Sequence, residues 1–108
     1  MTAAEFRKLA LSLEGAVEEE HMGHPDFRVG GKIFATMGYP DKSHAMVKLP
    51  LEQQHEFNVE EPDVFVPVKG GWGKKGATQV RLKAAKKETV KKALEAAWRR
   101  VGGRAGRA

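Results

Sequence analysis

The 108-residue sequence contains no cysteine. This absence excludes disulfide bonds, thiolate metal ligands and a cysteine nucleophile, and it is typical of a cytoplasmic protein. The sequence also lacks any apolar run near the ~20 residues that a membrane-spanning helix needs. Residues 1–5 show neither the basic nor the apolar segment of a secretory signal, so no signal peptide is expected. These absences predict a cytoplasmic chain with no membrane partner.

Serine is scarce, and neither Ser12 nor Ser43 lies in a Gly-x-Ser-x-Gly nucleophile elbow. The glycine-rich stretch 70–76 lacks the Gly-Lys-Ser/Thr ending of a Walker loop, and it has no βαβ setting of the dinucleotide-binding kind. His21, His24 and Asp26 lie close in sequence, but their spacing fits no strong metal motif, and we interpret the histidines as hydrogen-bonded turn residues. We therefore predict no catalytic residue, no cofactor and no metal.

Charge is abundant but unevenly distributed. Residues 1–68 carry six Lys/Arg and twelve Asp/Glu, a net charge of −6, whereas residues 69–108 carry thirteen and two, a net charge of +11. Such asymmetry indicates an anionic partner such as nucleic acid. The alternative is that the two halves fold together and neutralise each other across the surface.

Apolar residues at helical spacing predict helices over 3–14, 51–59 and 88–101. A capping box formed by Thr2 and Glu5 precedes the first helix. Alternating apolar residues predict five strands, over 26–29, 32–37, 45–49, 64–68 and 78–82. The two glycines at 30–31 predict a tight hairpin turn of the primed type. The acidic segment 17–22 is expected to be an extended approach to the first strand.

This order, α-β-β-β-α-β-β-α, predicts a two-layer α+β fold in which helices pack on one face of an antiparallel sheet. The length allows one domain, over residues 1–101, followed by a flexible Gly/Arg tail over 102–108. We expect a monomer or a weak dimer.

The stretch 68–78 holds four glycines, three lysines and Trp72, and it is predicted to connect the last two strands. Trp72 is either a core residue or a stacking platform, and its large apolar area favours the core. The last helix begins without a good N-cap residue and with lysines around its first turn, where free N–H groups favour an anion.

Three segments together resemble the MmcQ/YjbR family, over about residues 2–101. They are His21–Thr36, Met46–Leu49 and Gly70–Thr78. The resemblance implies an α-β(3)-α-β(2)-α fold of the double-wing kind, similar to secretion-chaperone folds. It also carries the family's "DNA-binding" label, but it implies no catalytic residue and no cofactor.

Our first hypothesis is therefore a nucleic-acid-binding module whose hairpins act as wings and whose contacts are mostly to phosphates. The candidate residues are Arg28, Lys32, Lys69, Trp72, Lys74, Lys75, Arg81, Lys83, Lys86 and Lys87. A second hypothesis is a protein- or peptide-binding adaptor that uses the open sheet face or an edge strand. A third, with less support, is a small-molecule or metal enzyme centred on His24, Asp26 and Arg28, with Asp26 orienting His24.

Overall fold

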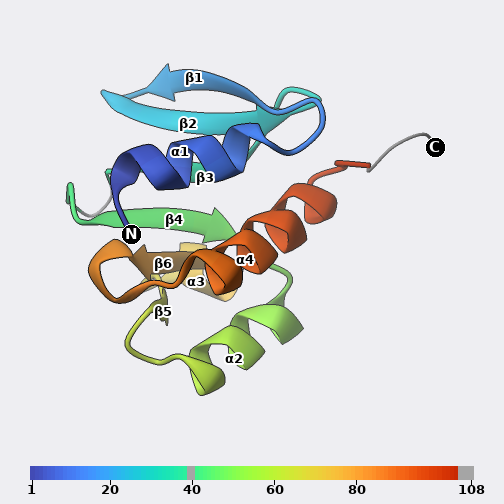
Figure 1. Ribbon diagram of the computed structural model, residues 1–108. Coiled ribbons are helices and arrows are strands. Elements are labelled where there is room, and N and C mark those ends of the chain that lie inside the picture. The colour runs from blue at the N-terminus through green and yellow to red at the C-terminus, as the bar shows by residue number, and fades with distance from the viewer. Residues whose placement is uncertain (39–40, 105–108) are drawn as a thin grey trace.

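A computed structural model describes residues 1–38 and 41–104. It shows one six-stranded antiparallel sheet with the strand order β1-β2-β3-β4-β6-β5 (Figure 1). The strands are β1 (Val17–His21), β2 (His24–Val29), β3 (Lys32–Met37), β4 (His44–Lys48), β5 (Phe65–Pro67) and β6 (Ala77–Arg81). The α-helices are α1 (Ala3–Leu11), α2 (Leu51–Glu60), α3 (Gly71–Lys74) and α4 (Lys87–Arg100).

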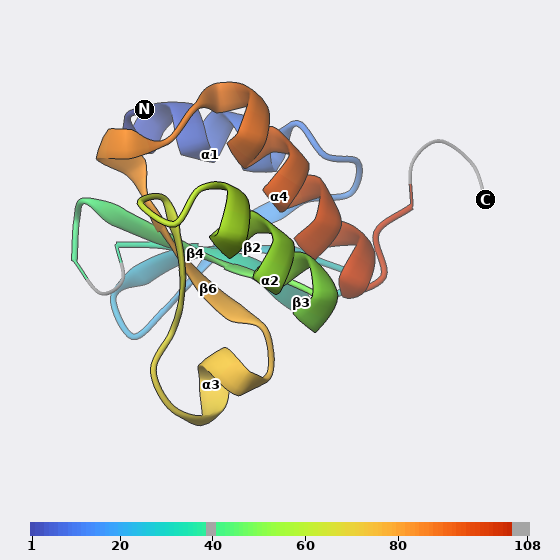
Figure 2. The same cartoon turned by 90° about the horizontal axis from the view of Figure 1, so that it is seen from below.

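The predicted α+β class is confirmed, and the helices divide between the two faces of the sheet. Figure 2 shows α1, α2 and α4 on one side and the short α3 on the other. Phe6 of α1 and Trp98 of α4 lie in the core between the helices and the sheet, where Phe6 packs edge-on against Phe27. No helix in the described ranges is long and apolar enough to cross a membrane.

The first helix begins as predicted and ends earlier. The Thr2 hydroxyl accepts from the Glu5 amide at 3.1 Å, and the Glu5 carboxylate accepts from the Thr2 amide at 2.8 Å, so the capping box is present. The helix ends at Leu11 rather than at residue 14. At its C-cap the Ser12 hydroxyl donates to the Leu9 carbonyl, which satisfies one of the terminal carbonyl groups.

The interpretation of residues 17–22 as an approach segment is wrong, because Val17–His21 forms the edge strand β1, paired with β2. The order predicted from the sequence therefore lacks one strand and the one-turn helix α3. Exposed glutamates in succession hid the strand, since an edge strand with few buried residues shows no apolar alternation. The predicted turn at Gly30 and Gly31 is confirmed, with φ values of 59° and 80°.

The β1–β2 hairpin turns at Met22 and Gly23, which have φ values of 51° and 80°. Because a left-handed conformation costs a residue with a side chain roughly 1 kcal/mol, and asparagine tolerates it best, we expect Met22→Asn to stabilise the fold by about 0.5–1 kcal/mol. Urea denaturation checks this. Met22→Ala is the matched control, since it removes the same side chain without favouring the turn. An equal gain from both variants would contradict the prediction.

The C-terminal end of α4 is fixed to the core. Trp98 is 1% exposed, and its indole N–H donates to the Glu14 carbonyl at 2.9 Å. Gly103 is buried and donates to the Trp98 carbonyl, and a side chain at position 103 would overlap the Trp98 ring. The first residues of the predicted tail thus lie against the domain, and residues 105–108 lie outside the described ranges.

The sheet face opposite α1, α2 and α4 is the open face. Strand register places Glu19, Asp26, Thr36, Met46 and Gln79 side by side in one row across five strands. Asp26, Thr36 and Met46 are buried although no long helix covers them. The open face is therefore indented rather than flat, and α3 forms one wall of the indentation.

Candidate functional site

The glycine-rich stretch folds into the single helical turn α3, within the connection between β5 and β6. Gly73 takes its inward position, where a Cβ atom would lie 1.7 Å from the Val68 carbonyl oxygen. Trp72 points outward and is 62% exposed. The expectation that Trp72 belongs to the core is therefore wrong, because a one-turn helix has one inward position and the adjacent backbone leaves room there only for glycine.

The seven cationic candidates of residues 69–87 are all exposed, and none lies within 4 Å of a carboxylate in the described part of the chain. They are Lys69, Lys74, Lys75, Arg81, Lys83, Lys86 and Lys87. Each ion pair among the described residues joins two residues on the same side of position 68. No ion pair within 4 Å among the described residues therefore joins the acidic half to the basic half.

These cations lie at the two ends of β6. Lys69, Lys74 and Lys75 surround α3 at the beginning of the strand, and Arg81 ends it on the same face as Ala77 and Gln79. Lys83 belongs to the 3₁₀ turn that follows, Leu82–Ala84. Five residues of strand separate the two groups by roughly 15 Å.

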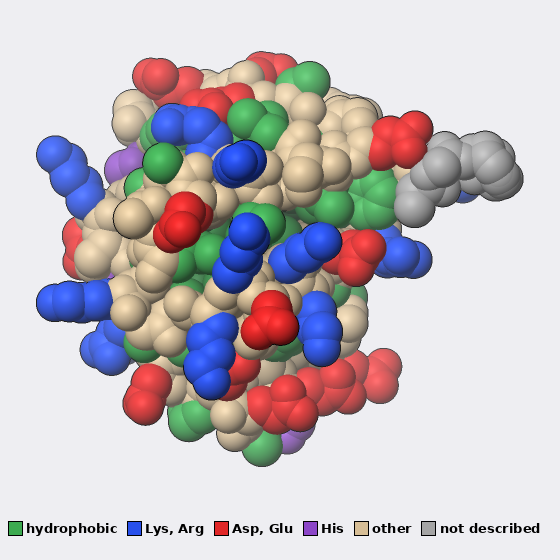
Figure 3. Space-filling view, in the orientation of Figure 1, with side chains coloured by type: hydrophobic (Ala, Val, Ile, Leu, Met, Phe, Trp, Pro, Cys, Tyr) green, Lys and Arg blue, Asp and Glu red, His purple; other side chains and the backbone are tan. Residues whose placement is uncertain are grey.

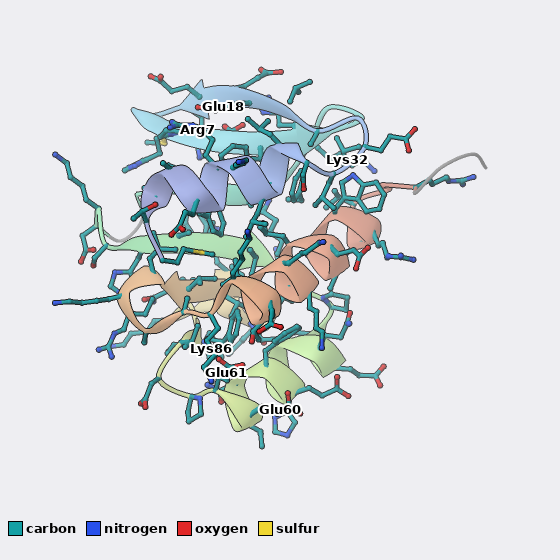
Figure 4. The ribbon with its side chains drawn as sticks, in the orientation of Figure 1. Arg7, Glu18, Lys32, Glu60, Glu61 and Lys86 are labelled. Carbon is teal, nitrogen blue, oxygen red and sulfur yellow. The ribbon has the colours of Figure 1, made fainter. Side chains whose placement is uncertain are left out.

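Lys86 is the N-cap of α4, and no side chain caps this helix end. Lys86 and Lys87 therefore stand beside free N–H groups, as predicted from the lack of a capping residue. Lys32 lies apart, at the β2–β3 turn, and Figure 4 shows it at a different end of the molecule from Lys86. The candidate residues thus form several groups rather than one surface.

On the helix side of the molecule, Lys and Arg side chains gather over α4, and Asp and Glu gather around α2 (Figure 3). A hollow of about 850 Å³ between these two helices is lined by both signs, with Glu56 and Glu60 on α2 and Lys92 and Arg99 on α4. The mixed charge of the helix side contrasts with the cations around α3.

Arg28 is engaged inside the protein. Its Nε and Nη2 donate to the two carboxylate oxygens of Asp26 at 2.8 and 3.1 Å, and Nη1 lies 3.5 Å from Glu19. Asp26 is fully buried, and its other contact is the His21 ring Nδ1 at 2.6 Å. The hydrogen bonds from Arg28, with a smaller contribution from His21, hold the pKa of Asp26 below its ordinary value.

The histidine that contacts Asp26 is therefore His21, and the proposed pairing of His24 with Asp26 is wrong. Both histidines lie on the side of the hairpin that carries Asp26, because His21 and His24 are paired across it, and His21 is the one that contacts the carboxylate. His21 is a strand residue rather than a turn residue, as is His24. Among the described residues, no three His, Asp or Glu side chains are grouped so that they could hold a metal ion.

Sequence reasoning missed the residues that accompany α3 on the open face: Thr36, Met46, Lys48 and Arg100. The β4 segment contained a partial signal, since Met46 and Lys48 share one face of an alternating strand. Arg100 could not be found in this way, because it reaches Lys75 from the end of a distant helix and donates to the Lys75 carbonyl at 2.8 Å.

These features define a small α+β domain with helices on one sheet face and a cation-rich helical turn on the other. The chain belongs to the YjbR family, whose model matches residues 11–100. Its fold is similar to the crystal structure of Deinococcus radiodurans protein DR2400, a DUF419 domain, with a TM-score of 0.77 and 17% sequence identity over 99% of this chain and 82% of that chain. No curated protein matches the sequence.

Proposed function

We propose that this protein is a nucleic-acid-binding module, not an enzyme, that acts in the cytoplasm and binds on the open face beside β4, β6 and α3. One observation carries the proposal: Trp72 is exposed on a helical turn whose flanking lysines have no carboxylate within 4 Å among the described residues. Exposed aromatic rings among lysines are typical of surfaces that stack bases and neutralise phosphates.

The arrangement favours single strands over duplex. Trp72 would stack on an unpaired base, while Lys69 and Lys74 contact the phosphates on either side of it. Arg81, on the same face at the far end of β6, would bind the same strand several nucleotides away. A duplex keeps its bases stacked and offers this tryptophan only the backbone or a groove.

The start of α4 supplies a second set of phosphate contacts. Lys83, Lys86 and Lys87 surround a helix end that lacks a side-chain cap, so free N–H groups and the helix dipole favour an anion there. Lys32, on the β2–β3 turn, would contact phosphates as a wing. Arg28 is held by Asp26 and would serve to position that hairpin rather than contact phosphate.

The alternative is a peptide-binding adaptor, in which a peptide would pair with one of the exposed edges of the sheet. The β1 edge carries Glu18, Glu19 and Glu20, which would repel all but basic peptides, and β5 has three residues that include Pro67. Both edges are therefore poor templates for an added strand, and nucleic acid remains the better-supported partner.

Salt dependence tests the proposal. With about four phosphate contacts, the affinity for single-stranded DNA should fall about 50-fold between ~50 and ~200 mM salt, because neutralised phosphates release counterions. Fluorescence anisotropy of a labelled oligonucleotide measures this, with a duplex of the same sequence for comparison. Absence of binding at ~50 mM salt, or an affinity insensitive to salt, would overturn the proposal.

Substitutions around α3 test whether this surface is the one that binds nucleic acid. Reversing Lys69 and Lys74 to glutamate should weaken binding at least about tenfold, and Trp72→Ala should weaken it to a similar extent through lost stacking. The control reverses Lys8 and Lys91, two exposed lysines on α1 and α4. It makes the same change in net charge, so an equal loss in the control would show that binding is not centred on α3.

A further inference from the structure

The indentation of the open face is a pocket of about 630 Å³ between the sheet and α3. This volume lies in the range of small-molecule sites. Side chains from five strands, α3, the β1–β2 turn and the end of α4 line it.

The floor of the pocket contains an unsatisfied polar group. Thr36 is 3% exposed, and its hydroxyl has no hydrogen-bond partner among the described residues. A buried hydroxyl left without a partner destabilises the fold, and most buried polar atoms in folded proteins are paired. Thr36 lines the hollow, so a polar ligand atom that enters between the side chains around this hydroxyl would satisfy it.

The walls of the pocket combine apolar and cationic side chains. Trp72 and Met22, 62% and 91% exposed, stand at the rim, while Ile33 and Met46 lie deeper. A flat apolar molecule in the pocket would remove part of this apolar surface from water.

Three cations surround the same hollow, and no Asp or Glu lines it. Lys48 is half-buried at the end of β4, and Lys75 and Arg100 come from opposite directions in the chain. None of the three lies within 4 Å of a carboxylate in the described ranges. Cations in a partly enclosed site without a counterion favour an anionic ligand.

His21 also lines the pocket and offers a ring nitrogen whose direction is fixed. Its Nδ1 contacts the buried Asp26 carboxylate, so this nitrogen carries the proton and the ring orientation is fixed. Nε2 is then the nitrogen left to contact a ligand in the pocket that His21 lines.

We propose that this pocket binds a small aromatic anion, whose carboxylate or phosphate is held by Lys48, Lys75 and Arg100. Its ring lies between Trp72 and Met46, and a polar ring substituent reaches the Thr36 hydroxyl. This pocket goes beyond the proposed function, because Lys69 and Lys74 of the nucleic-acid surface do not line it. Trp72 belongs to both the pocket and that surface.

The test uses the full chain, two probe anions and their neutral counterparts. Indole-3-acetate presents a carboxylate and adenosine 5′-monophosphate presents a phosphate, and indole-3-acetamide and adenosine lack the charge. We expect at least one anion to bind with a submillimolar Kd and to shift the amide NMR signals of Thr36, Met46 and Ala77. Its neutral counterpart should bind at least about tenfold more weakly. Which of the two anions binds shows whether the pocket prefers a carboxylate or a phosphate.

Lys48→Gln should weaken the anion at least about tenfold, and Thr36→Val, which keeps the side-chain shape, should weaken it severalfold. Lys8→Gln, a matched change at an exposed lysine of α1 outside the pocket, should leave it unchanged. No shift with either anion at about 10 mM, equal binding of the neutral counterpart, or an unaffected Lys48→Gln variant would overturn the proposal.

The same variants separate this site from nucleic-acid binding. Reversal of Lys69 and Lys74 should weaken oligonucleotide binding at least about tenfold and leave binding of the small anion unchanged. Thr36→Val should weaken the small anion severalfold and leave oligonucleotide binding unchanged. Loss of both ligands in both variants would show that a single site serves them, which would overturn the assignment of a separate pocket.

Discussion

Replacement of Asp26 by alanine is expected to lower the free energy of unfolding by about 3 kcal/mol. The carboxylate is fully buried and accepts from two guanidinium nitrogens of Arg28 and from His21. Its removal leaves the Arg28 charge, 23% exposed, without its closest partner. Urea denaturation at neutral pH measures the loss, and retained β-sheet circular dichroism shows that the variant folds.

The control for this prediction is Glu19→Gln, since Glu19 also contacts Arg28, at 3.5 Å, but is 54% exposed. Solvent-exposed ion pairs contribute little, so the control should cost less than about 1 kcal/mol. Similar losses in the two variants would mean that burial of the Asp26 carboxylate is not what stabilises the β1–β2 hairpin.

The pH dependence of stability tests the contribution of Asp26 independently. Because the hydrogen bonds from Arg28 lower the pKa of Asp26 in the folded state, the unfolded chain binds this proton more readily than the folded chain. The contribution to stability is therefore fully present above pH ~4, the ordinary range of an aspartate, and it is lost as the pH falls through the lower folded-state pKa. The difference in stability between the wild type and Asp26→Ala should therefore shrink as the pH falls through that range.

Replacement of Gly76 by alanine is expected to cost about 3 kcal/mol, the sum of a left-handed backbone and a steric overlap. Gly76 has φ of 107°, and a Cβ atom there would lie 2.0 Å from the Leu49 carbonyl oxygen. Its carbonyl accepts from the Leu49 amide and from the Thr78 hydroxyl, so the backbone cannot move without breaking contacts to the sheet. Chemical denaturation measures the loss.

Gly71→Ala is the matched control, because position 71 lies in the same connection, has no positive φ, and has open space where the Cβ atom would be. It should be near neutral or slightly stabilising, since alanine favours the helical turn. If Gly76→Ala were also neutral, the β5–β6 connection would be far more adaptable than its contacts indicate. α3 would then not be a fixed support for Trp72.

Features encoded by neighbouring residues were predicted correctly. The capping box of Thr2 and Glu5 and the turn at Gly30 and Gly31 each depend on residues within a few positions of one another. The helix over 87–100 follows from apolar spacing along one face. The helix over 51–60 was also predicted, although its one buried residue is the polar Gln54 and its Leu51 and Val59 are exposed. Strand β1 was missed because its exposed glutamates carry no such pattern, and it is held by pairing with β2.

The candidate site depended more on tertiary structure. The cations of residues 69–87 were visible as a charge asymmetry, but only the fold shows that they lie at the two ends of β6. The exposure of Trp72 follows from the Val68 carbonyl oxygen, which leaves room for no side chain at Gly73. The sequence alone does not show whether position 72 or position 73 faces the protein.

By itself, the sequence determined the α+β class, the resemblance to the YjbR family and the basic character of the second half, because each is written in local spacing or composition. Tertiary structure alone decided that His21 pairs with Asp26 and that Thr36, Lys48 and Arg100 meet beside Trp72. These contacts join residues from different strands and helices. Their distances are set by sheet register and by helix packing, which no local pattern of side chains specifies.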